Sequence, residues 1–354
     1  MFAVGDSDRA FSIQSACKPI LYGLALRNHG EDYVHTKVGN EPSGKPFDEL
    51  SFDDSGRAYN PMVNAGAIIT ANMLLGANAR DQYKAFEDAV KGMVLKESKD
   101  HVGIDWGVYD SEMQTNSHNQ KITAALSERD LVLGNSSESL AAYTMACSCS
   151  IDTVDAAVIA ATLANRGINP ATKETAMSEE VADQIVNVMM SCGMYNGAGK
   201  WIVDVGVPAK SGVSGGIMGV VPGVCGFSVF SPRLDEHGNS TRGVHVAQAL
   251  SEELGLHVLK QGLKAVRQEA DGSSSGKGKP RKTRRWSAGG EGEDISSRSG
   301  KDASNRGSNP VSMNSVVPFD TEDKGVLNPH DAMMADMSSA PQSKSPALPL
   351  ASAV

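Results

Sequence analysis

Two short motifs hold side chains that could together carry out acyl transfer. Ser15 stands three residues before Lys18 at the start of an apolar segment, and Lys210-Ser211-Gly212 follows near the end of the same apolar part of the chain. Residues three apart on a helix are neighbours, so Lys18 could accept the proton of the Ser15 hydroxyl as the serine attacks a carbonyl carbon. A Lys-Ser-Gly strand could form the opposite wall of such a site.

The surroundings of Ser15 favour this interpretation. Pro19 has no amide proton and its ring clashes with the carbonyl of Ser15, so a regular helix must begin at or just after Ser15. Free amides at a helix N-terminus would stabilise an oxyanion. Burial in this apolar helix would lower the pKa of Lys18, and a nearby Lys210 would act in the same direction. The alternative is a capping serine with a lysine that reaches solvent, and the same spacing recurs at 274–277.

The elements that position these motifs follow from hydrophobic periodicity. Spacings of three and four predict helices at 16–28, 62–78, 80–96, 120–133, 138–148, 152–165, 178–191 and 244–264. Strands are predicted at 201–207, 215–221 and 224–230, separated by Gly and Pro turns, and 2–5 resembles the end of a strand. Strands joined by short turns run antiparallel. The predicted fold class is therefore α+β, with a helical cluster packed on an antiparallel sheet.

The 354-residue chain changes composition near its last quarter. Residues 1–270 are rich in apolar side chains and carry 22 basic and 32 acidic groups, a net charge of −10, which argues against nucleic acid as a partner. Residues 271–354 are rich in Ser, Gly, Pro, Lys and Asp and carry a net charge of +1. We predict a folded domain over 1–266 and a disordered, low-complexity tail over 267–354.

The cysteines and histidines give no sign of a metal site or of a disulfide framework. The five cysteines lack any Cys-x-x-Cys or Cys/His ligand spacing, and we expect them to be small buried hydrophobes, which suits a reducing compartment: Cys17, Cys147, Cys149, Cys192 and Cys225. His101 and His118 are expected to be exposed. No apolar run is long enough to span a membrane and no signal-peptide pattern is found, so we expect an intracellular protein, in the cytoplasm or a mitochondrion.

Several strings resemble the serine-dependent glutaminase family. They are FSIQSACKP at 11–19, NPMVNAGAI at 60–68, the stretch 143–150, SCGMYNGAG at 191–199, PAKSGVSGGI at 208–217 and SPRLDEHGNSTRGVH at 231–245. They occur in the family's order between residues 2 and 262, which makes the resemblance much more specific than any single motif. It implies a fold like that of serine β-lactamases and D,D-peptidases, and hydrolysis of L-glutamine to L-glutamate and ammonia.

The resemblance implies a role for each matching residue. Ser15 resembles the nucleophile, Lys18 the general base, and Tyr195 a tyrosine that moves protons and contacts the substrate. The backbone amides of Ser15 and Val213 would form the oxyanion hole. The residues implied to hold the amino-acid end of glutamine are Asn64, Glu112, Asn119 and Tyr143. A carboxylate suits the α-ammonium group, while amide and phenol donors suit the α-carboxylate.

The resemblance also carries expectations about partners and alternatives. It implies L-glutamine as the substrate, no cofactor, and a homodimer or homotetramer, and nothing in the chain suggests binding to nucleic acid or a membrane. Family members have several dozen residues before the position of Met1, including a strand and a tyrosine near the site, so the folded domain is expected to lack its N-terminal part. One alternative is therefore a truncated, inactive homologue. Another is a β-lactamase or D,D-peptidase relative, although no Ser-Asp-Asn string is present.

Overall fold

The computed structural model describes residues 1–260, and a three-stranded antiparallel sheet lies at the centre of its strand-rich part. The strands are β4 (Ala209–Ser211), β5 (Gly216–Val221) and β6 (Cys225–Phe230), in the order β4-β5-β6. Lys210 is paired with Met218 and Ser211 with Ile217. The turn between β5 and β6 joins the two strands that the sequence predicted there, whereas the other neighbour of β5 is β4 and not the predicted strand at 201–207.

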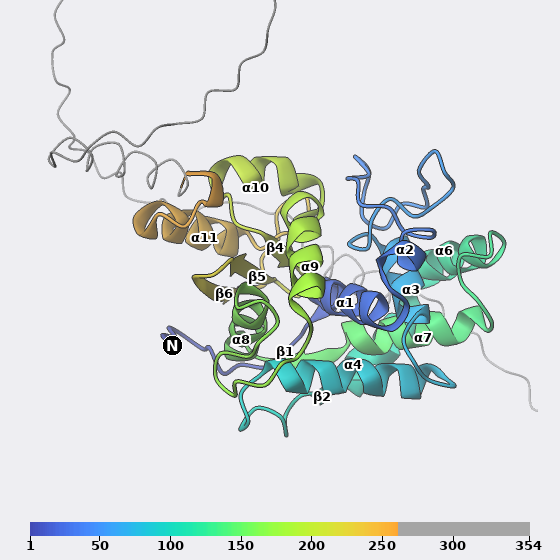
Figure 1. Ribbon diagram of the computed structural model, residues 1–354, viewed down its shortest axis with the longest axis horizontal. Helices are drawn as coiled ribbons and strands as arrows, with labels where there is room; N and C mark the ends of the chain where they lie inside the picture. Colours follow the sequence, from blue (N-terminus) through green and yellow to red (C-terminus); the bar gives the residue numbers. More distant parts are fainter. Residues whose placement is uncertain (261–354) are drawn as a thin grey trace, which may run out of the picture. The chain divides into compact units, whose positions relative to one another are not determined.

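Helices cover this sheet on both sides (Figure 1). The apolar α8 (Thr153–Ala164) packs against β5 and β6, and α11 (Thr241–Leu254) contacts β6. The helix α9 (Glu179–Cys192) contacts β4 and leads through a short 3-10 turn into α10 (Ala198–Asp204). A second, smaller core lies under α10, with Trp201 and Val205 packed against the sheet.

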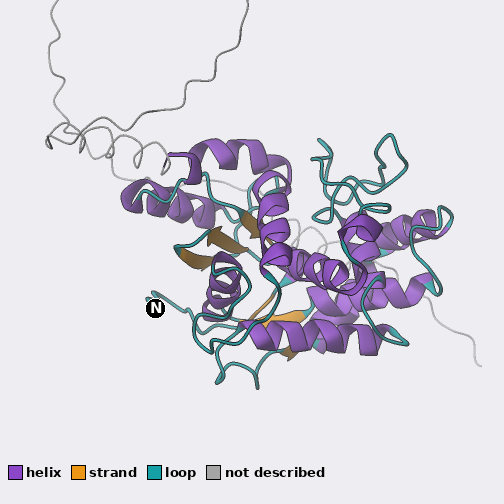
Figure 2. Cartoon of the chain, in the orientation of Figure 1, coloured by secondary structure: helices purple, strands orange, loops and turns teal. Residues whose placement is uncertain are grey.

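The other half of the described part is a cluster of helices. Helices also predominate over strands in the described part as a whole (Figure 2). Its centre is α1 (Lys18–His29), buried along most of its length and packed against α3 (Asn64–Asn72). Around it lie α2 (Glu31–Val34), α4 (Ala79–Met93), α5 (Trp106–Thr115), α6 (Ser117–Ser127) and α7 (Ser136–Cys147). A small second sheet has the order β1-β3-β2, from Phe11–Ser12, Cys149–Ile151 and Gly103–Ile104.

Two predicted strands are wrong. Residues 201–207 are a short run rich in apolar, β-branched side chains, yet most of this run belongs to α10, because Trp201 and Val205 fill the second core from one helical face. The Trp201 indole nitrogen also donates to the Val207 carbonyl over 2.6 Å. Residues 2–5 form no strand, and Phe2 is 90% exposed because no neighbouring strand pairs with this segment among the described residues.

Several predicted helices have different ends. The predicted helix at 62–78 is shorter in the structure, because α3 ends before Met73 and a loop follows. The predicted helix at 120–133 corresponds to α6, which begins at Ser117 and ends at Ser127. The predicted 244–264 helix begins at Thr241 and ends at Leu254, where Gly255 adopts a left-handed conformation. The predicted domain boundary at 266/267 and the predicted disordered tail lie outside the described residues. Within residues 1–260, no helix is both long and apolar enough to cross a membrane.

Candidate active site

The motif around Ser15 lies on a tight turn between β1 and α1. Residues Gln14–Cys17 form one turn of 3-10 helix and α1 begins at Lys18. Since Pro19 has no amide proton, the Ser15 carbonyl instead accepts the backbone N–H of Lys18. Ser15 is 5% exposed and Gln14 has a φ of 48°, which a non-glycine residue rarely adopts. The predicted helix start is thus correct in position, but the serine lies in a 3-10 turn.

Lys18 is fully buried directly after this turn. Its ammonium nitrogen Nζ donates to Asn64 Oδ1 over 2.6 Å and lies 5.7 Å from the ring centre of Phe47. Burial lowers the pKa of Lys18 to about 8, against the opposing influence of Cys147, Cys17 and Asp48. A lysine with this pKa is partly neutral near physiological pH and can accept a proton.

Three of the predicted substrate-binding residues are hydrogen-bonded to one another, and a fourth reaches the serine turn separately. Asn64, on α3, accepts the Tyr143 phenol at Oδ1 over 3.2 Å and donates from Nδ2 to Asn119 Oδ1 over 2.9 Å. Glu112, on α5, accepts the side-chain amide of Gln14 over 3.1 Å, directly beside the serine. The side chains from α3, α6 and α7 are therefore connected to Lys18 through Asn64, and α5 is connected to the turn that holds Ser15.

The Lys210-Ser211-Gly212 strand forms the facing wall, as predicted. A Cβ atom added to Gly212 would lie only 2.9 Å from the Ile13 carbonyl oxygen, so glycine is what lets the end of β4 approach the serine turn this closely. Lys210 is fully buried and donates to the Ser211 carbonyl over 2.7 Å. Val213, whose amide is a predicted oxyanion donor, follows on the β4–β5 turn and is 38% exposed.

Tyr195 closes the site from the turn after α9. Its phenol donates to the Ser211 carbonyl over 3.1 Å, and its ring lies 4.2 Å from Lys210 Nζ. Burial raises the pKa of Tyr195, while hydrogen bonds with Ser15 and with Ser211 lower it by less. Burial, followed by the charge of Lys18, holds the pKa of Lys210 well below its usual value.

Comparison with known proteins gives a consistent result. The family model described as Glutaminase matches residues 1–259. The chain belongs to the glutaminase family. A glutaminase of Nostoc sp. is 45% identical over 261 residues, which cover 73% of this chain and 77% of the relative. A glutaminase of Clostridioides difficile is 39% identical over 263 residues, which cover 73% of this chain and 84% of that relative.

Solved structures of glutaminases share the fold. The crystal structure of a probable glutaminase of Bacillus subtilis superposes with a TM-score of 0.68 at 32% identity, covering 71% of this chain and 84% of that one. Another neighbour is the covalent complex of the Bacillus subtilis glutaminase YbgJ with 5-oxo-L-norleucine, formed by reaction with 6-diazo-5-oxo-L-norleucine. Its TM-score is 0.64 at 32% identity, and the match covers 71% of this chain and 83% of that chain. The fold is the predicted β-lactamase-like arrangement of helices beside an antiparallel sheet.

In this member of the glutaminase family, sequence reasoning missed Phe47. Its ring packs against that of Tyr195 with the centroids 4.5 Å apart and the planes tilted by 37°, and its carbonyl accepts the Asn64 backbone N–H over 2.9 Å. Phe47 and Tyr195 also line a cavity of about 450 Å³. Phe47 lies in a long irregular loop between α2 and α3, so no periodicity could have indicated its place over Lys18.

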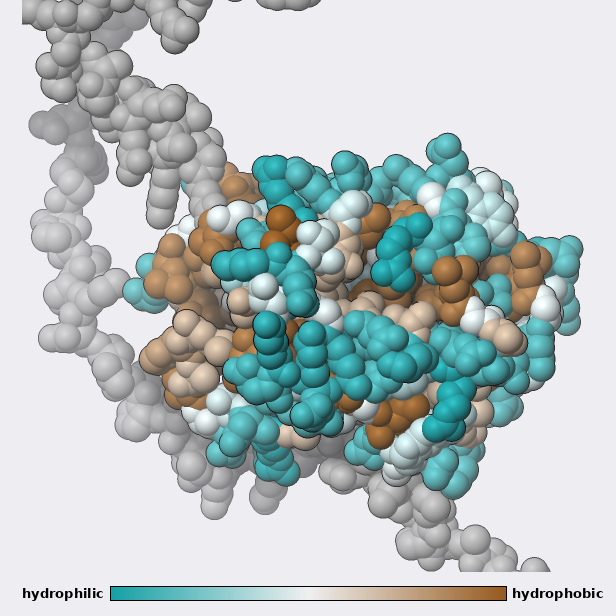
Figure 3. Space-filling view, turned by 60° about the horizontal axis from the view of Figure 1, so that its bottom comes forward, coloured by the Kyte–Doolittle hydropathy of each residue, from teal (hydrophilic) through white to brown (hydrophobic). Residues whose placement is uncertain are grey.

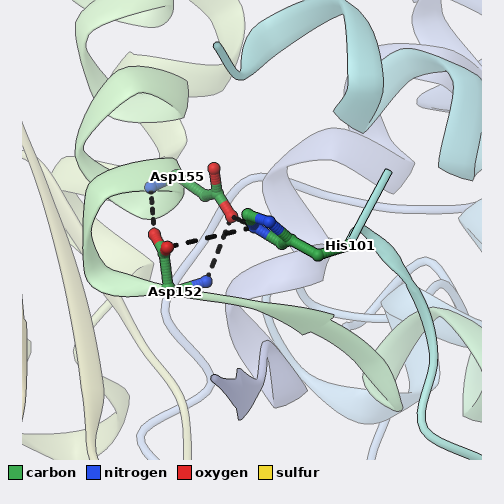
Figure 4. A group of neighbouring side chains, drawn as sticks. All are labelled: His101, Asp152 and Asp155. Atoms are coloured by element: carbon green, nitrogen blue, oxygen red, sulfur yellow. Dashed lines mark hydrogen bonds and ion pairs between the residues drawn. The ribbon is translucent and has the colours of Figure 1, made fainter. Parts of the chain in front are cut away.

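Sequence reasoning also missed a cluster formed by His101, Asp152 and Asp155 (Figure 4). His101 is exposed, as predicted, but its Nε2 lies 2.6 Å from Asp155 Oδ2 and 3.9 Å from Asp152 Oδ2. One candidate ligand atom from each residue lies within 4.8 Å of the others. The two aspartates also cap α8: Asp152 accepts the Asp155 backbone N–H over 2.8 Å and Asp155 accepts that of Asp152 over 3.1 Å. These reciprocal bonds explain the cluster as a helix cap extended by a histidine.

Proposed function

We propose that this chain hydrolyses the side-chain amide of L-glutamine to L-glutamate and ammonia through an ester on Ser15. The observation that carries the proposal is the fully buried Lys18, whose pKa is lowered to about 8, three residues after a buried serine. Membership of the glutaminase family supports the substrate and the reaction type.

The proposed first half-reaction forms the ester and releases ammonia. Lys18 takes the Ser15 proton while the oxygen attacks the amide carbon, and the amides of Ser15 and Val213 stabilise the oxyanion. The C–N bond breaks as the leaving nitrogen receives a proton from the protonated Lys18, or from Tyr195, whose phenolate then takes the proton that Lys18 holds. Support comes from the close approach of β4 to the serine turn and from the Tyr195 phenol beside it.

The second half-reaction returns the free enzyme. Lys18 takes a proton from water and the water oxygen attacks the ester carbon. The bond between that carbon and the Ser15 oxygen then breaks as Lys18 returns the proton to the serine. Glu112 would hold the α-ammonium group, and Asn64, Asn119 and Tyr143 the α-carboxylate of the substrate. Support comes from the bond of Glu112 to Gln14 beside the serine, and from the bonds of Asn119 and Tyr143 to Asn64, which contacts Lys18.

The test is ammonia release from L-glutamine by the purified chain and by Ser15→Ala, with the exposed Ser117→Ala as matched control. We expect release to fall by about 10⁴-fold or more in Ser15→Ala and to be unchanged in the control. Mass spectrometry after treatment with 6-diazo-5-oxo-L-norleucine should find the 5-oxo-norleucine adduct on the Ser15 peptide alone. Full activity in Ser15→Ala would overturn the proposal.

The two alternative functions, a β-lactamase relative and an inactive homologue, predict different results in these experiments. Hydrolysis of a chromogenic β-lactam without ammonia release from glutamine would favour a β-lactamase relative. Adduct formation on Ser15 without turnover would favour an inactive homologue that still binds glutamine-like molecules.

We also propose that the chain assembles as a homodimer or homotetramer. Large apolar side chains are exposed on the described part, among them Val203 (70%), Val224 (60%) and Leu254 (65%). Hydrophobic residues (brown) also gather in several groups between hydrophilic ones on the face drawn in Figure 3. Light scattering coupled to size-exclusion chromatography should give a mass two or four times that of the chain, and a monomer at all concentrations would contradict the proposal.

A further inference from the structure

Asn239 connects two segments of the site that lie far from it in the sequence. It belongs to the loop between β6 and α11 and is 3% exposed. Its Oδ1 accepts the Ser211 hydroxyl over 2.5 Å, and its Nδ2 donates to the Met194 carbonyl over 3.3 Å. A single side-chain amide therefore joins the Lys-Ser-Gly strand to the turn that carries Tyr195.

The bond to Met194 acts on the backbone of Tyr195. The Met194 carbonyl belongs to the peptide directly before Tyr195, and Tyr195 has a φ of 52°. Residues other than glycine rarely adopt this left-handed conformation, and they keep it only when the surroundings hold it. Since φ of Tyr195 sets the orientation of that preceding peptide, the Asn239 amide helps to fix φ.

The bond to Ser211 holds the residue that accepts the phenol of Tyr195. The Ser211 carbonyl accepts both the Tyr195 phenol, over 3.1 Å, and Lys210 Nζ, over 2.7 Å. Asn239 holds the same serine by its hydroxyl. The two bonds of Asn239 therefore hold the backbone before Tyr195 and the residue that accepts its phenol.

The loop that carries Asn239 is itself braced. Asp235 Oδ1 accepts the backbone N–H of Asn239 over 2.9 Å, and the Asp235 backbone N–H donates to the Asn239 carbonyl over 2.7 Å. The same turn lies against the phenol ring, because a Cβ atom added to Gly238 would be 3.7 Å from Tyr195 Cε2. The loop is thus a fixed support from which Asn239 can act.

We infer that Asn239 is a positioning residue that holds Tyr195 in its working place for proton transfer, an inference that rests on the proposed function of Tyr195. Asn239 acts through Tyr195 and Ser211 rather than on the reacting atoms. No motif or spacing in the sequence indicates this role.

A double-mutant cycle of Asn239→Ala with Tyr195→Phe tests the inference. We expect Asn239→Ala to lower kcat for glutamine about tenfold in the parent chain, and less than about twofold when Tyr195 is already phenylalanine. The same fold loss in both backgrounds would show that Asn239 acts independently of the phenol and would overturn the inference.

A conservative variant of Asn239 and a control variant outside the site accompany the double-mutant cycle. Asn239→Asp keeps the volume and the acceptor for Ser211 but loses the donor to Met194, and its kcat should also fall only when Tyr195 is present. If Asn239→Ala does not fold, this variant alone decides. Asn169→Ala is the matched control, because Asn169 is likewise buried and donates to a backbone carbonyl, that of Val94 over 2.9 Å, but lies outside the site. Its kcat should be unchanged.

A crystal structure separates this inference from the proposed function. If the parent chain releases no ammonia, the proposed function fails, but the position of Tyr195 in Asn239→Asp still tests the support. We expect the phenol to leave the Ser211 carbonyl and the Met194 peptide to rotate. An unmoved Tyr195 would overturn the inference.

Discussion

Lys18 Nζ donates to Asn64 Oδ1 over 2.6 Å, a bond that joins the first residues of α1 and α3. The acceptor is a neutral amide, so it orients the amine without the strong preference for the charged form that a carboxylate would give. The same Oδ1 also accepts the Tyr143 phenol over 3.2 Å. Asn64 therefore holds the proposed base in place while burial keeps its pKa low.

The first prediction concerns the pH dependence of turnover. A general base acts only when neutral, and burial lowers the pKa of Lys18 to about 8. We expect kcat/KM for glutamine to rise about tenfold per pH unit below pH 8 and to level off above it. Ammonia release measured from pH 6 to 10 checks this, and a flat profile would exclude Lys18 as the base.

The second prediction is that Asn64→Asp moves this profile to higher pH. A carboxylate in contact with Lys18 Nζ favours the protonated lysine, so the pKa of Lys18 should rise by about one unit or more and activity at pH 7 should fall about tenfold. Asn72→Asp, at the other end of α3, is the control and should leave the midpoint in place. An unchanged midpoint in Asn64→Asp would contradict the assigned contact.

The third prediction concerns Glu112. Its proposed contact with the α-ammonium group is a charge-assisted hydrogen bond, which contributes about 1.5–3 kcal/mol. Glu112→Gln should therefore raise KM for glutamine about 10- to 100-fold. The exposed Glu128→Gln should behave like the parent chain. Steady-state kinetics decide, and an unchanged KM would remove Glu112 from the substrate site.

The fourth prediction concerns stability. A Cβ atom added to Gly193, at the end of α9, would lie 1.7 Å from the Ala209 carbonyl oxygen of β4. Gly193→Ala should therefore lower the free energy of unfolding by about 2 kcal/mol or more, because backbone must move apart. Gly199→Ala has no atom within 4 Å of the added Cβ and should differ from the parent by about 0.5 kcal/mol or less. Thermal unfolding of the two variants compares them directly.

Local patterns predicted the long helices and the antiparallel sheet well. The apolar spacing of α8 and α9 and the Gly and Pro turns around β5 are properties of short segments, so they could be read without the rest of the chain. Residues 201–207 failed because a short apolar run fits a strand or a buried helix equally well. The pairings of β1, β2 and β3 involve two or three residues each, too few for any pattern.

The candidate site divides in the same way. The local sequence is enough to predict that Ser15 and Lys18 are neighbours, since three residues of helical chain place them together and Pro19 sets where the regular helix begins. Only the packing of distant segments brings Lys18 to Asn64, Glu112 to Gln14, and Asn239 to the Met194 carbonyl directly before Tyr195. These contacts join residues 45 to 98 positions apart along the chain. The lowered pKa of Lys18 likewise depends on burial, which only the packing of several helices around α1 provides.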